Sequence, residues 1–373
     1  MLKLFEVTGF KNFHKPIKID FTDVRDYKFN SNCVTNGFIS KMIIYGKNAI
    51  GKTNFGRALM DITTITRLQR VRFVAAFEED TYDVSYLNTN NNNDYAEFRY
   101  VFRFDDQEIE YIYRKNKLQS LVYERVSIND LLLFDYDREF PEKCDIDGIK
   151  KISPTLNTSF ENVESVLAYV VSNTPLDAEH PLRKMFIFIG SMKFNISPYD
   201  RIRTARGFLP VILSEPEILR EFEDLLHASG INDNLLILKD NDGKERLYFD
   251  KSPPLLFERV ASSGTKTLLD FFVAYKRVES GFASLLFLDE FDAFYHFELA
   301  ENIVLMLTKM KNTQVIFTSH NTNLLSNRIM RPDCYYILTT DKLTSFANAT
   351  TRELREGHNL EKLFMSGEFD EQA

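Results

Sequence analysis

Residues Gly46–Thr53 read GKNAIGKT and match the phosphate-binding pattern G-x-x-x-x-G-K-[ST]. The apolar run Lys41–Tyr45 (KMIIY) precedes this stretch, and apolar residues recur at spacings of three and four from Lys52 to about residue 68. Together these patterns predict a buried strand, a glycine-bounded turn and a helix. The glycines would let successive backbone N–H groups face phosphate oxygens at the positive end of the helix. We expect Lys52 to reach the β- and γ-phosphates and the Thr53 hydroxyl to ligate Mg²⁺.

A second motif lies far along the chain, where the apolar run Ser284–Leu288 (SLLFL) ends in Asp289 and Glu290. From Phe257 onward the patterns predict helix, strand, helix, strand, helix and strand, which is typical of a parallel α/β sheet. Such sheets bind ligands at the carboxyl ends of their strands. Successive side chains on a strand point to opposite faces, so the two acids can take different roles. We expect Asp289 to hold Mg²⁺ through water beside Thr53, and Glu290 to orient and deprotonate an attacking water.

Two further turns carry candidate residues. Ala261–Lys266 (ASSGTK) precedes an apolar helix, and its small residues leave backbone N–H groups free as a second anion site. One triphosphate does not need two such sites in one chain, so we expect this turn to meet the γ-phosphate held by another subunit. The alternative is an ordinary serine-capped helix. Gln314–Thr318 (QVIFT) predicts another buried strand, which ends in Ser319 and His320. His320 at that edge would contact the γ-phosphate and the attacking water, although a lone histidine is more often a surface or core residue.

The composition excludes several classes of protein. The 373 residues include 46 Lys+Arg and 54 Asp+Glu, a net charge of −8, so any nucleic-acid binding would need a local basic patch. The three cysteines are widely spaced, which argues against a disulfide scaffold and fits a reducing cytosol. The apolar runs fall far short of the about 18 residues of a membrane span, and Met1–Phe10 lacks the apolar core of a signal peptide. We expect a cytoplasmic protein of two or three structural units that does not contact a membrane.

These motifs, in this order, resemble the ABC-type ATPase heads of SMC-like, RecF-like and OLD-like proteins. The resemblance is closest to the small AAA/OLD-like ATPases of bacterial phage-defence systems, such as those of the PARIS or AbiL/Rlo type. It rests on Thr8–Phe13 (TGFKNF), Tyr45–Asn54, Phe257–Leu269 (FERVASSGTKTLL), Leu288–Asp292 with His296, Thr318–Thr322 (TSHNT), Arg328–Asp333 and Asn359–Lys362.

The resemblance implies a P-loop head with a mixed sheet around a parallel core and an antiparallel β subdomain. Residues 1–127 would form an N-terminal lobe that contains the phosphate loop and a β-hairpin, predicted from the alternation of Phe98–Phe104 and Ile109–Tyr113. Residues 128–245 would form a mostly helical insert, for example at Pro216–Ala228 (PEILREFEDLLHA). Residues 246–373 would form the C-terminal lobe.

The resemblance also implies the cofactors ATP and Mg²⁺ and a head-to-tail dimer that holds two ATP between its heads. Glu290, His320 and Lys52 would be catalytic, and Thr53 and Asp289 would bind the metal. Asp292 carries over as an acid at the dimer interface, and Lys11 would lie near the nucleotide. The nucleotide contacts would come from Asn12, Gly46, Lys47, Asn48, Ala49, Ile50, Gly51, Lys52, Thr53 and Asn54 of one subunit and from Ser262, Ser263 and Gly264 of the other.

This chain departs from the family pattern in three places. Ala49 stands where many SMC-like heads have a second glycine, and Ser263 replaces the first glycine of the usual signature. The glutamine that normally links Mg²⁺ to the insert has no clear equivalent.

The leading hypothesis is therefore an ATPase that acts as a sensor or scaffold for a separate effector, a nuclease or toxin, in anti-phage defence. The 53 residues after His320 are fewer than a fused Toprim nuclease domain would need. One alternative is an SMC-like or RecF-like clamp on DNA, for which the arginine clusters at 67, 70 and 72 and at 201, 203 and 206 are candidates; for each cluster we favour a solvated face or an internal salt-bridge set. A transporter motor and a nucleotide switch that does not hydrolyse ATP are further alternatives. Nucleic acid or a phage protein would then be additional partners.

Overall fold

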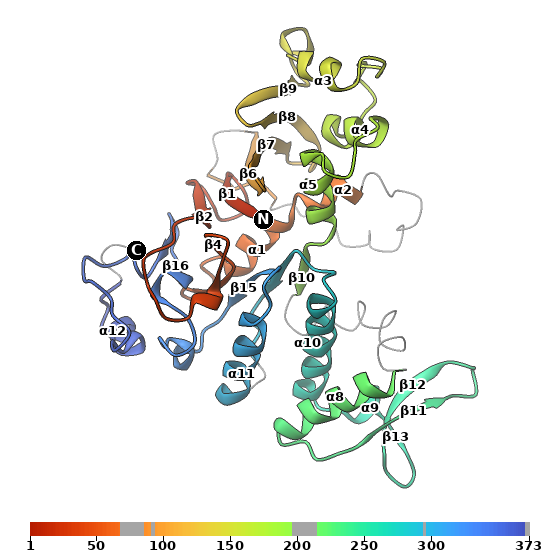
Figure 1. Cartoon of the computed structure of the whole chain (residues 1–373), viewed down its shortest axis with the longest axis vertical. Coiled ribbons are helices and arrows are strands. Elements are labelled where there is room, and N and C mark those ends of the chain that lie inside the picture. The colour runs from red at the N-terminus through yellow and green to blue at the C-terminus, as the bar shows by residue number, and fades with distance from the viewer. Residues whose placement is uncertain (68–85, 91–93, 196–214, 294–295, 370–373) are drawn as a thin grey trace.

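Residues 1–67, 86–90, 94–195, 215–293 and 296–369 are described by the structure, a computed structural model of the chain (Figure 1). Two six-stranded sheets dominate it, and a three-stranded sheet projects at one end. Among the described residues, no helix is long and apolar enough to cross a membrane.

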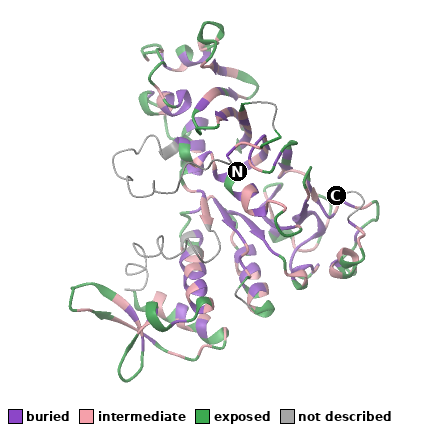
Figure 2. Cartoon of the chain, turned by 180° about the vertical axis from the view of Figure 1, so that it is seen from behind, coloured by how far each residue is buried: buried purple, intermediate pink, exposed green. Residues whose placement is uncertain are grey.

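The core sheet contains the strand that leads into the phosphate loop. Its order is β10-β14-β15-β5-β16-β17, and its first five strands are parallel while β17 is antiparallel. Every residue of β5, β14, β15 and β16 is buried, which is typical of parallel strands covered on both faces (Figure 2). The mixed sheet with a parallel core confirms the predicted fold class. The strands are β5 (Lys41–Tyr45), β10 (Lys193–Asn195), β14 (Leu285–Leu288), β15 (Gln314–Thr318), β16 (Tyr335–Leu338) and β17 (Leu343–Ser345).

The second large sheet is antiparallel, with the order β2-β1-β6-β7-β8-β9, and it contains the predicted hairpin as β6–β7. This sheet extends past the boundary expected at residue 127, because β9 continues it to Asp137. Asn129 and Asp130 join β8 to β9 with φ values of 49° and 62°, as a two-residue hairpin turn requires. The strands are β1 (Leu2–Thr8), β2 (Ile17–Asp20), β6 (Tyr95–Phe104), β7 (Gln107–Asn116), β8 (Leu121–Ile128) and β9 (Leu131–Asp137).

Helix α1 (Lys52–Met60) lies between the two large sheets. On one side its Phe55 ring meets Phe5 of β1, with centroids 5.7 Å apart, and on the other it meets Phe287 of β14 at 6.4 Å. A Cβ on Gly56 would lie 2.5 Å from the Phe287 ring, so glycine permits this close approach. The predicted single helix from Lys52 to residue 68 is broken after Met60, and α2 (Thr63–Arg67) follows.

The described part of the middle of the chain contains strands as well as the expected helices. Besides its helices, the described part of 128–245 contains β9, β10 and β11, and β10 joins the edge of the core sheet. Three residues are too few for a periodic signal, and β10 is held instead by β14 and by the Phe194 ring, 5.3 Å from that of Phe287. The helices are α3 (Asp147–Ile152), α4 (Val166–Asn173), α5 (Pro181–Gly190) and α8 (Pro216–Ala228). The three-stranded sheet consists of β11 (Leu235–Lys239), β12 (Glu245–Phe249) and β13 (Leu255–Leu256).

The C-terminal part follows the predicted alternation for four elements and then departs from it. α9 (Phe257–Val260) and α10 (Ser263–Glu279) precede β14, and α11 (Phe297–Thr308) connects β14 to β15. The helix predicted between β15 and β16 is wrong, because only two 3₁₀ turns occur there, at Thr322–Leu324 and Pro332–Cys334. Asparagine and proline favour such turns over a helix. The small elements are a 3₁₀ turn at Ser31–Cys33, β3 (Val34–Thr35), β4 (Phe38–Ile39), a 3₁₀ turn at Pro141–Lys143 and α12 (Leu360–Met365).

Candidate nucleotide-binding site

The loop from Gly46 to Gly51 joins the carboxyl end of β5 to the start of α1. A Cβ on Gly46 would lie 2.8 Å from the backbone oxygen of Leu338, so the loop passes close to β16. Gly51 has a φ of 111° and Ala49 a φ of 61°, so two residues of this loop have positive φ values, which glycine adopts most readily. α1 begins at Lys52 without a side-chain cap, which leaves its first N–H groups to a ligand or to water.

The Lys52 ammonium group is folded back onto the loop. Its Nζ lies 3.0 Å from the backbone oxygen of Gly46, 3.4 Å from that of Lys47 and 2.7 Å from Nε2 of His320. Burial lowers the pKa of Lys52, while the carboxylates of Glu290 and Asp289 act in the opposite direction. The fold thus brings the end of β15 to the phosphate loop.

Three side chains meet where β14 and β15 end. The Thr53 hydroxyl donates to one carboxylate oxygen of Asp289 at 2.6 Å, and the Thr318 hydroxyl donates to the other at 2.7 Å. Asp289 is only 2% exposed. The backbone N–H of Glu290 donates to the Thr318 hydroxyl at 2.7 Å, and Glu290 has a φ of 43°. Thr318 therefore holds the Asp289 carboxylate and the backbone of Glu290, a role that the sequence analysis did not assign to it.

His320 lies between Lys52 of the phosphate loop and Glu290 at the end of β14. Its Nε2 is 3.9 Å from a carboxylate oxygen of Glu290. Burial and then the Lys52 charge lower the pKa of His320, so the imidazole is neutral at pH 7 and Nε2 can accept from the Lys52 ammonium. The neighbouring Ser319 hydroxyl donates to Asp292 at 2.5 Å, and burial raises the pKa of that carboxyl.

The side-chain oxygens of Thr53 and Asp289 suit Mg²⁺. A threonine hydroxyl and a carboxylate are hard oxygen ligands, and Mg²⁺ usually takes one or two protein oxygens and keeps several waters. Because Thr53 and Asp289 already lie within hydrogen-bond distance, both could face one ion.

The N-terminal turn also reaches the loop. The Asn12 amide donates to the backbone oxygen of Ile50 at 2.8 Å, and its oxygen accepts from the Asn54 amide at 2.7 Å. Lys11 has a φ of 47° at the tip of this turn. The predicted residues Asn12, Ile50 and Asn54 are therefore in direct contact.

The predicted signature turn lies elsewhere in the same copy. Ser262 is the N-cap of α10, and its hydroxyl accepts from the backbone N–H of Thr265 at 3.1 Å. The turn follows α9, which packs on β12, at the opposite end of α10 from the core sheet (Figure 1). Within the described residues, the side-chain bonds of Ser262 go to Thr265 and not to the phosphate loop. The structure of one copy is thus compatible with both interpretations of this turn, a serine-capped helix and a contact with the γ-phosphate of another subunit.

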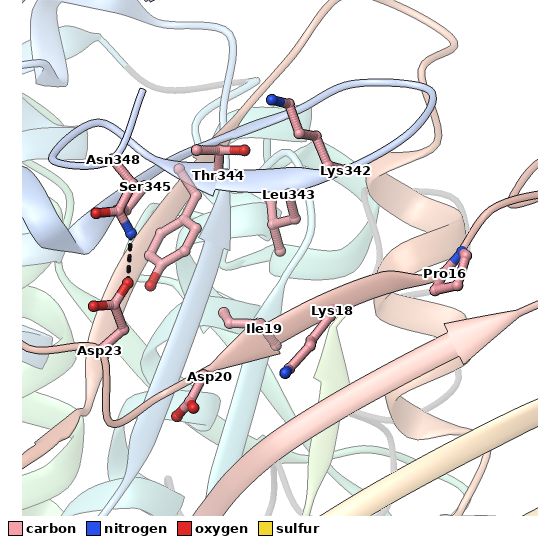
Figure 3. A pocket seen from close by; sticks show the side chains of 11 residues that line it. Pro16, Lys18, Ile19, Asp20, Asp23, Lys342, Leu343, Thr344, Ser345 and Asn348 are labelled. Atoms are coloured by element: carbon pink, nitrogen blue, oxygen red, sulfur yellow. Dashed lines mark hydrogen bonds between the residues drawn. The ribbon is translucent and has the colours of Figure 1, made fainter. Parts of the chain in front are cut away.

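A separate hollow of about 300 Å³ lies between β2 and β17 (Figure 3). Ile19 and Leu343 lie on opposite sides of it, and Asp23 accepts from the Asn348 amide at its edge. The described residues that line this hollow include no predicted nucleotide contact.

Most of the arginines proposed for a DNA clamp lie outside the described residues. This holds for Arg70, Arg72, Arg201, Arg203 and Arg206, and only the backbone of Arg67 is described, at the end of α2.

A model of the family described as "AAA domain, putative AbiEii toxin, Type IV TA system" matches residues 41–326, which is most of the chain. This chain belongs to that family. The family is one of P-loop ATPase domains, and the matched range contains the phosphate loop, Asp289, Glu290 and His320. No match is found among curated protein sequences.

Solved structures of SMC heads are similar to this family member. The SMC head bound to the C-winged helix domain of ScpA has a TM-score of 0.50 and 16% identity, over 92% of this chain and 97% of that chain. The SMC head domain from Thermotoga maritima has a TM-score of 0.43 and 15% identity over 92% and 98%. The Pyrococcus yayanosii SMC head with a coiled coil and joint has a TM-score of 0.48 and 11% identity over 98% and 99%. The first likeness confirms the predicted head fold, and at such identity it shows the fold alone.

Proposed function

We propose that this chain binds ATP with Mg²⁺, hydrolyses it slowly as a head-to-tail homodimer, and thereby controls a separate nuclease or toxin in bacterial anti-phage defence. One observation carries the ATPase part of this proposal. Lys52, Thr53, Asp289, Glu290 and His320 come from three distant parts of the sequence and meet where β5, β14 and β15 end. That edge of a parallel sheet is where ligands bind.

Nucleotide binding begins with the phosphate loop and Lys52. The ammonium group, now directed at the Gly46 and Lys47 carbonyls and His320, turns to the β- and γ-phosphates. Thr53 and Asp289 would hold Mg²⁺, and that ion would supply positive charge to offset the negative charge on the transferred phosphoryl group.

Hydrolysis then uses the side chains around Thr318. Glu290 accepts a proton from water as the water oxygen bonds to the γ-phosphorus and the bond to the ADP oxygen breaks. His320, neutral at pH 7, lies beside both Glu290 and Lys52 and orients the water and the γ-phosphate.

The dimer supplies the remaining contacts. α10 begins at Ser263, so the backbone N–H groups of Ser263 and Gly264 lie in its first turn and have no acceptor within the helix, and Ser263 is exposed. In a head-to-tail pair this turn, with Ser262, would close over the γ-phosphate of the partner subunit.

The family description supports the link to a toxin, since it names AbiEii and a type IV toxin–antitoxin system. The similar SMC head is bound to a domain of another protein, ScpA, which supports the idea that this head fold carries a separate partner. We infer that ATP-driven closing and opening of the dimer controls the effector.

A pull-down from the native cells tests the effector part. Tagged Glu290→Gln protein, which should hold ATP and stay dimeric, is compared with Lys52→Ala protein, which should bind little ATP. A stoichiometric nuclease or toxin that is captured only by the Glu290→Gln protein would support the proposal. Capture of DNA without such a protein would instead support a clamp that acts directly on nucleic acid.

A further inference from the structure

Asn12 lies at the tip of a tight turn after β1 that is held from several sides. The Gly9 N–H donates to the Phe13 oxygen at 2.8 Å, which closes the turn. The Lys11 N–H donates to the Tyr86 oxygen at 3.0 Å. The Asn88 amide donates to the Lys11 oxygen at 2.6 Å. Neighbouring segments therefore fix the backbone on which Asn12 stands.

Both polar atoms of the Asn12 side chain are used within the protein. Its nitrogen donates to the Ile50 carbonyl, and its oxygen accepts from Asn54 in the first turn of α1. Asn54 thus orients the Asn12 amide so that its N–H₂ group faces the phosphate loop. Each atom keeps one further hydrogen-bonding position, but these two contacts fix the plane and direction of the amide.

The contact with Ile50 determines the direction of the next N–H group. In a trans peptide the C=O of Ile50 and the N–H of Gly51 lie in one plane and point in opposite directions. Holding the Ile50 carbonyl toward Asn12 therefore turns the Gly51 N–H away from Asn12.

Gly51 fits this arrangement in two ways. Its φ of 111° is rarely adopted by L side chains. A Cβ there would also lie 2.3 Å from the Asn12 amide nitrogen and 2.7 Å from its oxygen. The turn itself therefore favours glycine, and a larger residue at position 51 would displace the Asn12 amide from the Ile50 carbonyl.

We propose that Asn12 is a positioning residue for the phosphate loop: it holds the Ile50 carbonyl outward so that the Gly51 N–H faces the phosphates, and it does not touch the nucleotide. This inference rests on the proposed nucleotide site. Asn54 acts through Asn12, as the residue that orients its amide.

The test measures ATP and ADP binding to the full-length protein by isothermal titration calorimetry with Mg²⁺. Because the loop contacts phosphates that ATP and ADP share, Asn12→Ala should raise both dissociation constants by a similar factor, about tenfold for one hydrogen bond. Asn12 is exposed, so the melting temperature should stay unchanged. Asn157→Ala is the matched control, because this exposed asparagine also makes a side-chain bond to the backbone, accepting from the Ser159 N–H, and lies far from the loop in the sequence.

A double-mutant cycle tests whether Asn54 acts through Asn12. Asn54→Ala should weaken binding, and combining it with Asn12→Ala should add little beyond Asn12→Ala alone. Fully additive effects, or a much larger loss for ATP than for ADP, would overturn the positioning role. Normal affinity in Asn12→Ala would also overturn it while leaving the proposed function intact, whereas a wild-type protein that binds neither nucleotide would overturn both.

Discussion

The phosphate loop and the turn before α10 both present the N-terminus of a helix after a short stretch of small residues, yet the structure completes only one of them. At the loop, Lys52, Thr53, Asp289 and His320 surround the first turn of α1. At the other turn, Ser262 caps α10. The N-terminus of α1 is a candidate site because β14 and β15 bring Asp289 and His320 to it. In the proposed dimer, a second copy would bring such groups to the turn before α10.

The largest expected effect is on the rate of ATP hydrolysis at the nucleotide site around the start of α1. Glu290→Gln should lower the rate of ATP hydrolysis by roughly 10³-fold, as the loss of a general base does, while ATP binding is retained. Steady-state phosphate release measures the rate, and size-exclusion chromatography with ATP should show a persistent dimer. A variant that hydrolyses ATP at the wild-type rate would remove Glu290 from the mechanism.

The next effect concerns binding at the loop. Lys52→Ala should weaken ATP binding by roughly 100-fold, because it removes a charged donor to the phosphates. Fluorescent-nucleotide titration measures the dissociation constant. Lys117→Ala is the control, since it removes an exposed lysine at the β7–β8 turn. Unchanged affinity in Lys52→Ala would mean that Gly46–Thr53 is not the phosphate site.

A smaller effect separates the two interpretations of the turn before α10. Ser262→Asp keeps an oxygen that can cap α10, so the melting temperature should change little. If this turn meets the partner's γ-phosphate, the added charge should lower hydrolysis and ATP-dependent dimerisation by about tenfold or more, while ATP binding to the monomer stays normal. Wild-type hydrolysis in this variant would leave Ser262 as a helix cap only.

The smallest effect is a pH dependence of stability at His320. Its pKa in the folded protein lies below the ordinary value, so the unfolded chain binds more protons as the pH falls. The neutral His320 therefore stabilises the folded protein fully at pH values above the ordinary histidine pKa. This stabilisation is lost as the pH falls through the lower pKa that His320 has in the folded protein. The side chain is 43% exposed, so we expect well under about 1 kcal/mol. Urea unfolding at pH 7.5 and pH 5 measures it, and a wild-type pH dependence in His320→Gln would contradict this assignment.

Short-range patterns in the sequence were enough to predict the strand–loop–helix unit at Lys41–Met60, the β6–β7 hairpin and the strands β14 and β15. Each carries its signal within a few consecutive residues, as alternation, a continuous apolar run or fixed glycine positions. The order of the motifs also predicted that Lys52, Asp289 and His320 would share one edge of a parallel sheet. Their contacts in the structure agree with that expectation, while their catalytic roles stay predictions.

Other features depend on contacts between segments that are distant in the sequence. β10 is a strand because β14 offers its edge, and the helix expected between β15 and β16 gives way to 3₁₀ turns. Thr318 holds Asp289 and Glu290 only because β15 lies beside β14, and Asn12 reaches Ile50 only because the turn after β1 folds over the loop. A hydrogen bond between residues tens or hundreds of positions apart produces no periodic pattern in the sequence. These contacts are therefore determined by which strands pair in the core sheet and by the turn that folds over the phosphate loop.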